Sequence, residues 1–195
     1  MPSPIGHSLV GFTVHLATSR QDQSFCWRRM ALCVFAANAP DLDFIPGLLA
    51  GEPDRFHHGA SHSLGFAVVF AILISLFLRG MKTDWVRSPF LILLGLYSSH
   101  LALDYLSIDT APPYGLPLLW PATHKYYIAA FPFLPDIRRD NSTAYFLPSL
   151  VSGHNLWSVA LESFLLAPLL LLVRALRSRP NAGEGRGGRN RCAAE

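Results

Sequence analysis

Two side chains that can bind a metal ion, His100 and Asp104, stand four positions apart near the end of the apolar run 90–104. On an α-helix this spacing puts both side chains on one face. An imidazole beside a carboxylate on an otherwise apolar helix is costly unless a third group compensates the pair. A divalent metal ion is the compensation most often met. A His–Asp hydrogen bond inside a core is the plainer alternative.

More histidines and aspartates stand at the ends of other apolar runs. They are His7 at the start of run 5–19, Asp41 and Asp43 after run 25–39, and His57, His58 and His62 before run 64–78. The two aspartates follow Pro40, so they can also be turn or capping residues. Of the adjacent His57 and His58, only one is expected to face a common site.

Five apolar runs of 15 to 18 residues predict five helices, at 5–19, 25–39, 64–78, 90–104 and 156–173. Pro40 is expected to end the second helix, with loop to residue 56, and Ser61 is an N-cap candidate for the third. The Pro- and Gly-rich segment after Asp104 predicts a long ordered loop or lid that reaches Pro148. The predicted fold is an all-α membrane helical bundle of about five short helices (1–173), followed by a disordered Arg/Gly-rich tail (174–195).

The composition favours a membrane protein or a very apolar helical one. Hydrophobic residues make up 51% of the 195 residues and charged residues only 15%, against about 25% charged in soluble domains. The mean hydropathy is +0.30. None of the runs has the roughly 20 clean apolar residues of an isolated transmembrane helix. They are therefore either short spans in a bundle or core helices of a soluble protein.

The charges are distributed unevenly along the chain. Twelve of the sixteen basic residues fall between the first and second helices, between the third and fourth, or after the fifth. In an up-down bundle these regions share one end, which the positive-inside rule places in the cytoplasm together with the tail. The metal-ligand candidates then converge at the opposite, extracytoplasmic end. The tail arginines could also contact nucleic acid, but cytoplasmic retention explains them as well, and we prefer it.

The converging residues predict a site for one or two zinc or manganese ions, because His and Asp bind such ions and the three cysteines show no metal-binding spacing. These ions lower the pKa of bound water to about 7 and polarise phosphoryl or carbonyl oxygens. Only His15 and Glu162 lie deep in the predicted bundle, whereas a transporter should show polar residues along several helices. This distribution favours an enzyme.

The motifs, in order, resemble the predicted membrane-bound metal-dependent hydrolases of the YdjM type over about residues 1–130. They are His7, PDLD (40–43), HHGASHS (57–63), HLALD (100–104) and YGLPLLWP (114–121). In that family the third motif usually reads His-Arg-Gly-x-Thr-His-Ser, so His58 stands where the family has arginine, and residues 108–113 look inserted. The resemblance implies an inner-membrane protein with a hydrolase site, and it favours His57 over His58 as the ligand. The site is also similar to that of zinc-dependent phospholipase C and related nucleases.

Our hypothesis from the sequence is a metal-dependent hydrolase that acts on a phosphoester such as a lipid head group. The expected ligands are His7, Asp41, Asp43, His57, His62, His100 and Asp104. A carboxylate of Asp41 or Asp43 that does not bind metal would be the general base. Lys125 is expected to contact the phosphate, ahead of Arg138 and Arg139. The alternative is a non-enzymatic membrane protein with a structural metal, or one that binds or transports metal ions.

Overall fold

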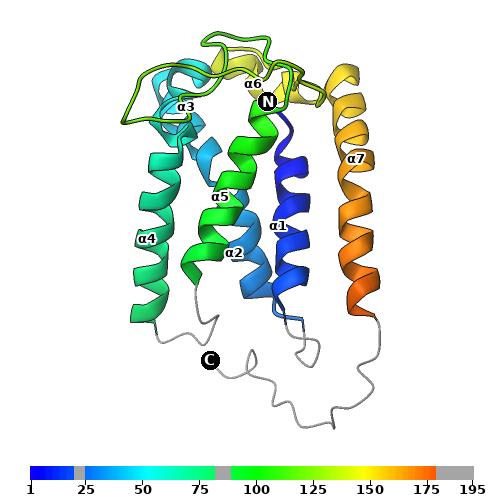
Figure 1. Ribbon diagram of the computed structural model, residues 1–195. Helices are drawn as coiled ribbons and strands as arrows, with labels where there is room; N and C mark the ends of the chain where they lie inside the picture. The colour runs from blue at the N-terminus through cyan, green and yellow to red at the C-terminus, as the bar shows by residue number, and fades with distance from the viewer. Residues whose placement is uncertain (20–24, 82–88, 179–195) are drawn as a thin grey trace, which may run out of the picture.

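The computed structural model describes residues 1–19, 25–81 and 89–178, and these residues form helices and no strand. Five long helices run side by side (Figure 1). They are α1 (Pro4–Thr18), α2 (Trp27–Asn38), α4 (Leu64–Gly80), α5 (Pro89–Tyr105) and α7 (Gly153–Arg177). The all-α bundle predicted from the apolar runs is confirmed.

The chain after Pro40 is helical, so the prediction of a loop up to residue 56 is wrong. Short helices follow one another as η1 (Ala39–Asp43), α3 (Phe44–Ala50), η2 (Pro53–Phe56) and η3 (Ala60–His62). Pro40 lies in the first turn of η1, where the N–H that proline lacks would have no helical partner. The chain therefore passes from α2 into α3 with only a short 3₁₀ turn between them.

Two helix boundaries also differ from the prediction. Ser63, and not Ser61, caps α4, because its hydroxyl accepts the N–H of Phe66 at 3.1 Å. Helix α7 begins earlier than predicted and continues to Arg177 through Pro168. Residues 174–177 are therefore helical and do not belong to the tail. The rest of the predicted tail, from residue 179, lies outside the described residues.

Small side chains bring the helices of the bundle close together. Cys33, Ala36 and Ala37 of α2 are fully buried in one cluster with Ala71 of α4 and leucines of α5. Helices α1 and α2 approach closely at Gly11 of α1. A Cβ atom added there would lie 2.9 Å from the backbone oxygen of Cys33. Small residues at helix interfaces are typical of membrane bundles, where tight packing drives association.

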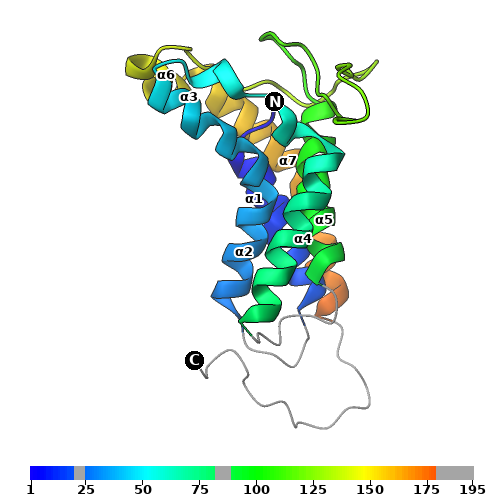
Figure 2. The ribbon, with the colours of Figure 1, turned by 90° about the vertical axis from the view of Figure 1, so that its left-hand side faces the viewer.

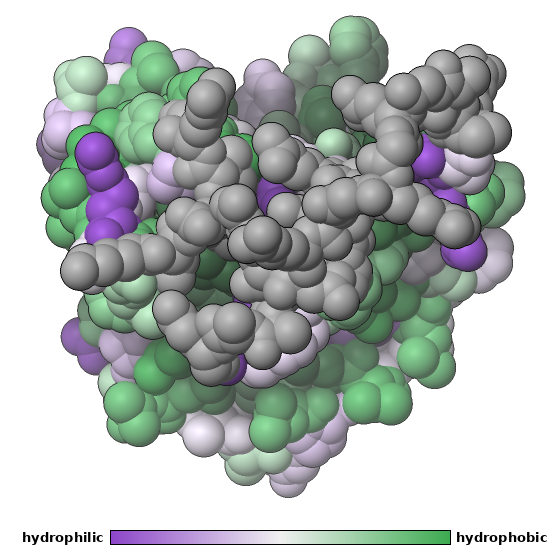
Figure 3. Space-filling model, turned by 90° about the horizontal axis from the view of Figure 1, so that it is seen from below, coloured by the Kyte–Doolittle hydropathy of each residue, from purple (hydrophilic) through white to green (hydrophobic). Residues whose placement is uncertain are grey.

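Large apolar side chains point outward from the bundle along its length. Phe77 on α4 and Phe164 on α7 are 63% and 75% exposed, and hydrophobic residues surround the bundle in the view along its axis (Figure 3). Two stretches, Trp27–Ala50 and Gly153–Arg177, are long and apolar enough to cross a membrane by length and composition. Both stretches are longer than the apolar runs counted in the sequence, because α2 continues through η1 into α3 and α7 extends to Arg177.

One end of the bundle is covered by α3, by α6 (Thr143–Leu150) and by the long segment that follows α5 (Figure 2). This segment is ordered by backbone pairing, for example from the N–H of Ile108 to the oxygen of Leu134 at 2.9 Å. The start of α2 and the last turns of α4 and α7 lie at the opposite end (Figure 1), and they carry Arg29, Arg79 and Arg174. The other basic residues counted for that end at positions 20, 82, 87 and 179–191 lie outside the described residues.

Candidate metal centre

His100 and Asp104 occupy the last turns of α5 with their side chains together. The Nε2 atom of His100 lies 3.1 Å from Asp104 Oδ2. The other ring nitrogen, Nδ1, lies 2.8 Å from the backbone oxygen of Ala37 in α2. A carbonyl oxygen only accepts hydrogen bonds, so Nδ1 carries the proton and a neutral ring presents an unprotonated Nε2. A lone pair thus faces a carboxylate, and a cation between them would satisfy both.

His62 repeats this arrangement from a different part of the chain. It lies in η3, and its Nδ1 is 3.0 Å from Asp43 Oδ2. An ionised carboxylate can only accept hydrogen bonds, so Nδ1 is the donor in this contact. Its Nε2 points the other way, 3.4 Å from Asp104 Oδ2 and 3.7 Å from Asp41 Oδ1. The carboxylate–histidine contact on the far side of the ring is the usual second-layer support of a metal ligand.

His7 and Asp41 complete the group. The Nε2 atom of His7, in the second turn of α1, lies 3.5 Å from Asp104 Oδ1. The His7 ring stacks on that of His100, with centroids 3.7 Å apart. Asp41 lies in η1, and its Oδ1 is 3.5 Å from His100 Nε2. We call His7, Asp41, His62, His100 and Asp104 the His/Asp cluster.

The facing atoms of the His/Asp cluster have no hydrogen-bond partner. They are the Nε2 atoms of His7, His62 and His100 and all four carboxylate oxygens of Asp41 and Asp104. These atoms approach one another at ion-pair distances but in poor geometry for hydrogen bonds. Leaving a buried polar group unsatisfied costs about 1–3 kcal/mol. The same arrangement becomes favourable when a cation occupies the space that the atoms share.

The spacing of these atoms fits a zinc-sized ion. Ligand atoms about 2.1 Å from a tetrahedral ion are roughly 3.4 Å apart, and the contacts within the His/Asp cluster span 3.1–3.7 Å. Two groups, His7–Asp41–His100 and His62–His100–Asp104, each offer three ligand atoms within 4.8 Å of one another. Imidazole and carboxylate ligands suit zinc and manganese. The residues therefore fit the metal that the sequence motifs imply.

The electrostatics around His62 show a strongly negative environment. Burial alone would lower the pKa of His62, but the nearby carboxylates of Asp104, Asp41 and Asp43 raise it well above its ordinary value. The neighbouring His58 shows the opposite effect, because burial and the nearby His57 and His62 rings hold its pKa well below the ordinary value. A positive charge is therefore stabilised at His62, next to the aspartates, and destabilised at His58.

Asp43 and His57 lie one layer outside the His/Asp cluster. Asp43 accepts hydrogen bonds from His57 Nδ1 at 3.0 Å and from the Ser61 hydroxyl at 2.8 Å, in addition to its contact with His62. The Nε2 atom of His57 lies 2.8 Å from Met1 Sδ. From its position Asp43 can orient the ring of His62 through the contact with Nδ1. The groups Asp41–Asp43–His57 and His57–His58–His62 also bring ligand atoms within 4.8 Å, so a second ion has candidate donors here.

Three further polar residues singled out from the sequence, Glu162, His154 and His15, lie outside the His/Asp cluster. Glu162 on α7 is fully buried and accepts hydrogen bonds from the N–H and hydroxyl of Ser3, the N-cap of α1. It therefore faces the bundle interior, as expected of a carboxylate at mid-helix. His154 contacts Asp136 Oδ1 at 2.9 Å. His15 is buried two turns below His7 in α1.

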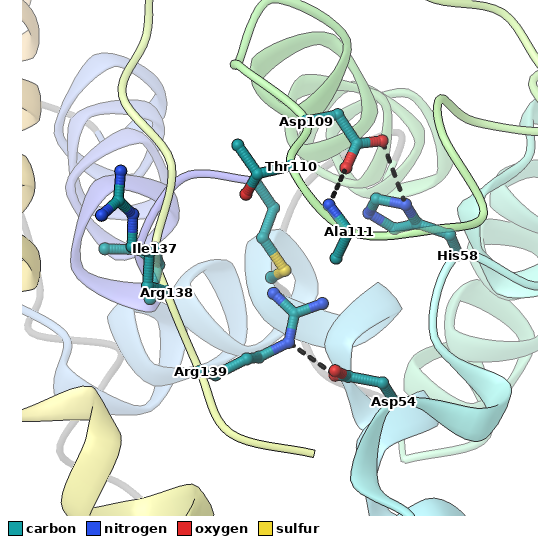
Figure 4. A pocket seen from close by; sticks show the side chains of 9 residues that line it. Asp54, His58, Asp109, Thr110, Ala111, Ile137, Arg138 and Arg139 are labelled. Atoms are coloured by element: carbon teal, nitrogen blue, oxygen red, sulfur yellow. Dashed lines mark hydrogen bonds and ion pairs between the residues drawn. The ribbon is translucent and has the colours of Figure 1, made fainter.

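A cavity of about 400 Å³ lies beside the His/Asp cluster. Its lining comprises Met1, Asp54, His58, Asp109, Thr110, Ala111, Ile137, Arg138 and Arg139 (Figure 4). His58 connects the two regions, because its ring centroid is 5.1 Å from that of His62. Its backbone has a φ of 57°, a strained value for a non-glycine residue.

The residues of the cavity were largely missed by the sequence argument. Lys125, the expected phosphate contact, is exposed and does not line the cavity, whereas the less favoured Arg138 and Arg139 do. Asp109 falls in the segment that looked inserted, and it lies 3.8 Å from His58. The available signal was charge. Arg138 and Arg139 are two of the four basic residues that are not assigned to the basic end of the bundle.

The fold and the site together define a class. The chain is a helical membrane-type bundle with a buried His/Asp cluster at one end. A family model described as YdjM inner membrane protein matches residues 1–180. The chain therefore belongs to the YdjM inner membrane protein family. Neither a curated protein nor a solved structure matches it.

Proposed function

We propose that this inner membrane protein is a metal-dependent hydrolase that acts on a phosphoester. One observation carries the proposal: seven buried ligand atoms from five side chains face a shared space without any hydrogen-bond partner. Zinc fits best, with manganese as the alternative, and the groups around His57 leave room for a second ion. A divalent ion held there supplies a Lewis acid that polarises a phosphoryl oxygen and activates water.

The residues of this chain divide the remaining tasks. His62 and His100 present Nε2 because Asp43 and the backbone oxygen of Ala37 hold their other ring nitrogens. Of the two aspartates, Asp41 is the better candidate for the general base, acting through a carboxylate oxygen that does not hold the ion. Neither of its oxygens accepts a hydrogen bond, whereas those of Asp43 accept three. The adjacent cavity is the proposed place for the substrate.

We place the site on the extracytoplasmic face and the C-terminal tail in the cytoplasm, as a multi-pass arrangement. The support is the position of Arg29, Arg79 and Arg174 at the end of the bundle away from the His/Asp cluster (Figure 1). A fluorescent reporter that folds only in the cytoplasm, fused to the C-terminus, tests this placement. Fluorescence is expected, and its absence from a fusion that is produced and inserted would reverse the orientation.

A structural metal is the second candidate function, and one observation favours it. None of the five members of the His/Asp cluster lines the cavity, and five donors can close the coordination shell of a zinc ion. Cobalt-substituted protein separates the two functions. An absorption spectrum that changes when phosphate is added indicates an open coordination position, as a hydrolase needs. A spectrum that phosphate leaves unchanged indicates a closed, structural site.

The first experiment is metal content by mass spectrometry of the detergent-purified protein, beside a His100→Ala, Asp104→Ala double variant. We expect one or two equivalents of zinc or manganese in the unchanged protein and none in the variant. A matched control is His154→Ala, Asp136→Ala, which removes a His–Asp contact outside the His/Asp cluster and should keep the metal. Protein that carries no metal and takes none up on reconstitution would end the hydrolase proposal.

A further inference from the structure

Arg139 is held rigidly at the wall of the cavity. Its side chain is only 10% exposed, and its Nε donates a hydrogen bond to Asp54 Oδ1 at 2.6 Å. The guanidinium carbon lies 5.0 Å from the ring centroid of Phe44. Figure 4 shows its two terminal nitrogens pointing into the cavity, away from Asp54. A planar guanidinium fixed in this way is preorganised for an anion with two oxygens.

The charges around the cavity leave this position open to an anion. Among the described residues, Asp54 is the only hydrogen-bond acceptor of Arg139. The other carboxylate in the lining, Asp109, lies beside His58. Arg138 adds a second positive charge at the rim, where its side chain is 67% exposed and its Nε is 3.6 Å from Asp136.

The helices that flank the cavity present an apolar outer surface. Phe44 of α3, which packs under Arg139, also contacts Phe146 of α6 with ring centroids 5.5 Å apart. Figure 2 shows α3 and α6 together at one side of the bundle end. Exposed side chains on these two helices and at the C-cap of α6 include Leu49, Tyr145, Leu147 and Val151, which are 66–85% exposed. A soluble phosphate compound would gain nothing from contact with such a surface, whereas the acyl chains of a lipid can pack against it.

We propose that the cavity binds the phosphate-bearing head group of a membrane lipid. The phosphate oxygens accept hydrogen bonds from the terminal nitrogens of Arg139, and the acyl chains lie along the exposed apolar side of α3 and α6. The hydrolytic fate of this lipid rests on the proposed function. The binding step itself depends on Arg139 and the apolar surface and requires no metal.

Equilibrium binding of dioctanoyl phosphatidic acid to the full-length protein in detergent tests the proposal. Arg139→Gln is expected to weaken binding about tenfold or more, as the loss of a charge-assisted pair predicts. Arg55→Gln is the matched control. It removes an exposed arginine of η2 that does not line the cavity, so binding should stay within about twofold. Asp54→Asn keeps the guanidinium and an oxygen that can accept its Nε hydrogen bond but removes the charge. It should weaken binding less than Arg139→Gln does, and its thermal unfolding shows whether loss of the ion pair alone disturbs the fold.

The comparison with glycerol 3-phosphate separates a lipid from a soluble ligand. We expect it to bind far more weakly than the short-chain lipid, and equal affinity would overturn the assignment to a lipid. An Arg139→Gln variant that binds the lipid as tightly as the unchanged protein would overturn the phosphate position. Lipid binding that persists in the metal-free His100→Ala, Asp104→Ala variant separates this inference from the proposed function. Metal binding without any lipid binding would overturn the lipid assignment and leave the proposed hydrolase function standing.

Discussion

Asp43 offers the sharpest test of how the site is built. Its carboxylate is close to three donors, namely Nδ1 of His57 at 3.0 Å, Nδ1 of His62 at 3.0 Å and the hydroxyl of Ser61 at 2.8 Å. We therefore expect Asp43 to act as a positioning residue that fixes the ring of His62. Asp43→Asn keeps the shape of the side chain but replaces one accepting oxygen with an NH₂ donor. This donor must then face the N–H of a histidine or the Ser61 hydroxyl.

The size of the effect follows from this geometry. Loss of a second-layer partner lowers metal affinity by about 10–100-fold, which corresponds to about 1.4–2.8 kcal/mol. Asp104→Ala removes a carboxylate whose two oxygens both face the shared space within 3.5 Å of His7, His62 and His100. Its loss should abolish measurable binding. The structure therefore predicts an ordered series from unchanged protein through Asp43→Asn to Asp104→Ala.

Competition with a chromophoric zinc chelator in detergent measures the three affinities. Glu52→Gln is the control for a lost carboxylate, since that side chain is 61% exposed and remote from the His/Asp cluster, and it should bind as the unchanged protein does. If Asp43→Asn loses zinc as completely as Asp104→Ala, Asp43 is itself a ligand. If it binds as tightly as the unchanged protein, the orienting role is wrong.

Two further predictions concern the bundle that carries the site. Gly11→Ala puts a methyl group 2.9 Å from the backbone oxygen of Cys33 and should destabilise the protein by about 1–3 kcal/mol. Gly95→Ala, with nothing within 4 Å, should be neutral or slightly stabilising in thermal unfolding, and equal effects would contradict close helix packing at Gly11. Glu162→Leu leaves the buried N–H of Ser3 without its acceptor and should cost about 1–3 kcal/mol, measured as a lower midpoint in detergent denaturation. An unchanged midpoint would mean that this buried contact adds no net stability.

The helical bundle could be predicted because its signals are local. Apolar runs and their separation by charged segments fixed the five long helices, and the i, i+4 spacing put His100 and Asp104 together. One failure came from proline. Pro40 was expected to end the second helix and begin a loop, but it lies in the first turn of η1, and the chain continues into α3. Whether a proline ends a helical segment depends on the side chains that pack around it in the folded protein, and the sequence does not show these neighbours.

The site could be predicted only in outline, because the layers of a site depend on side-chain direction. Asp41 and Asp43 are two residues apart and look equivalent in sequence, yet the 3₁₀ turn aims one at His100 and the other at His57. The cavity was harder to predict because residues 106–142 have no apolar period that would place Arg139. Its position depends on long-range contacts such as the one with Asp54.

The order in which the cluster's donors occur along the chain has a consequence for biogenesis. All five lie between residues 7 and 104, so they have all been synthesised before α7 leaves the ribosome. The contact that anchors the start of α1, from Ser3 to Glu162, comes from α7 and can form only afterwards. The nascent protein thus has a complete donor set while one of its helices still lacks its final neighbour. A cation captured at that stage would join α1, η1, η3 and α5 and act as a template for the insertion of the last helix.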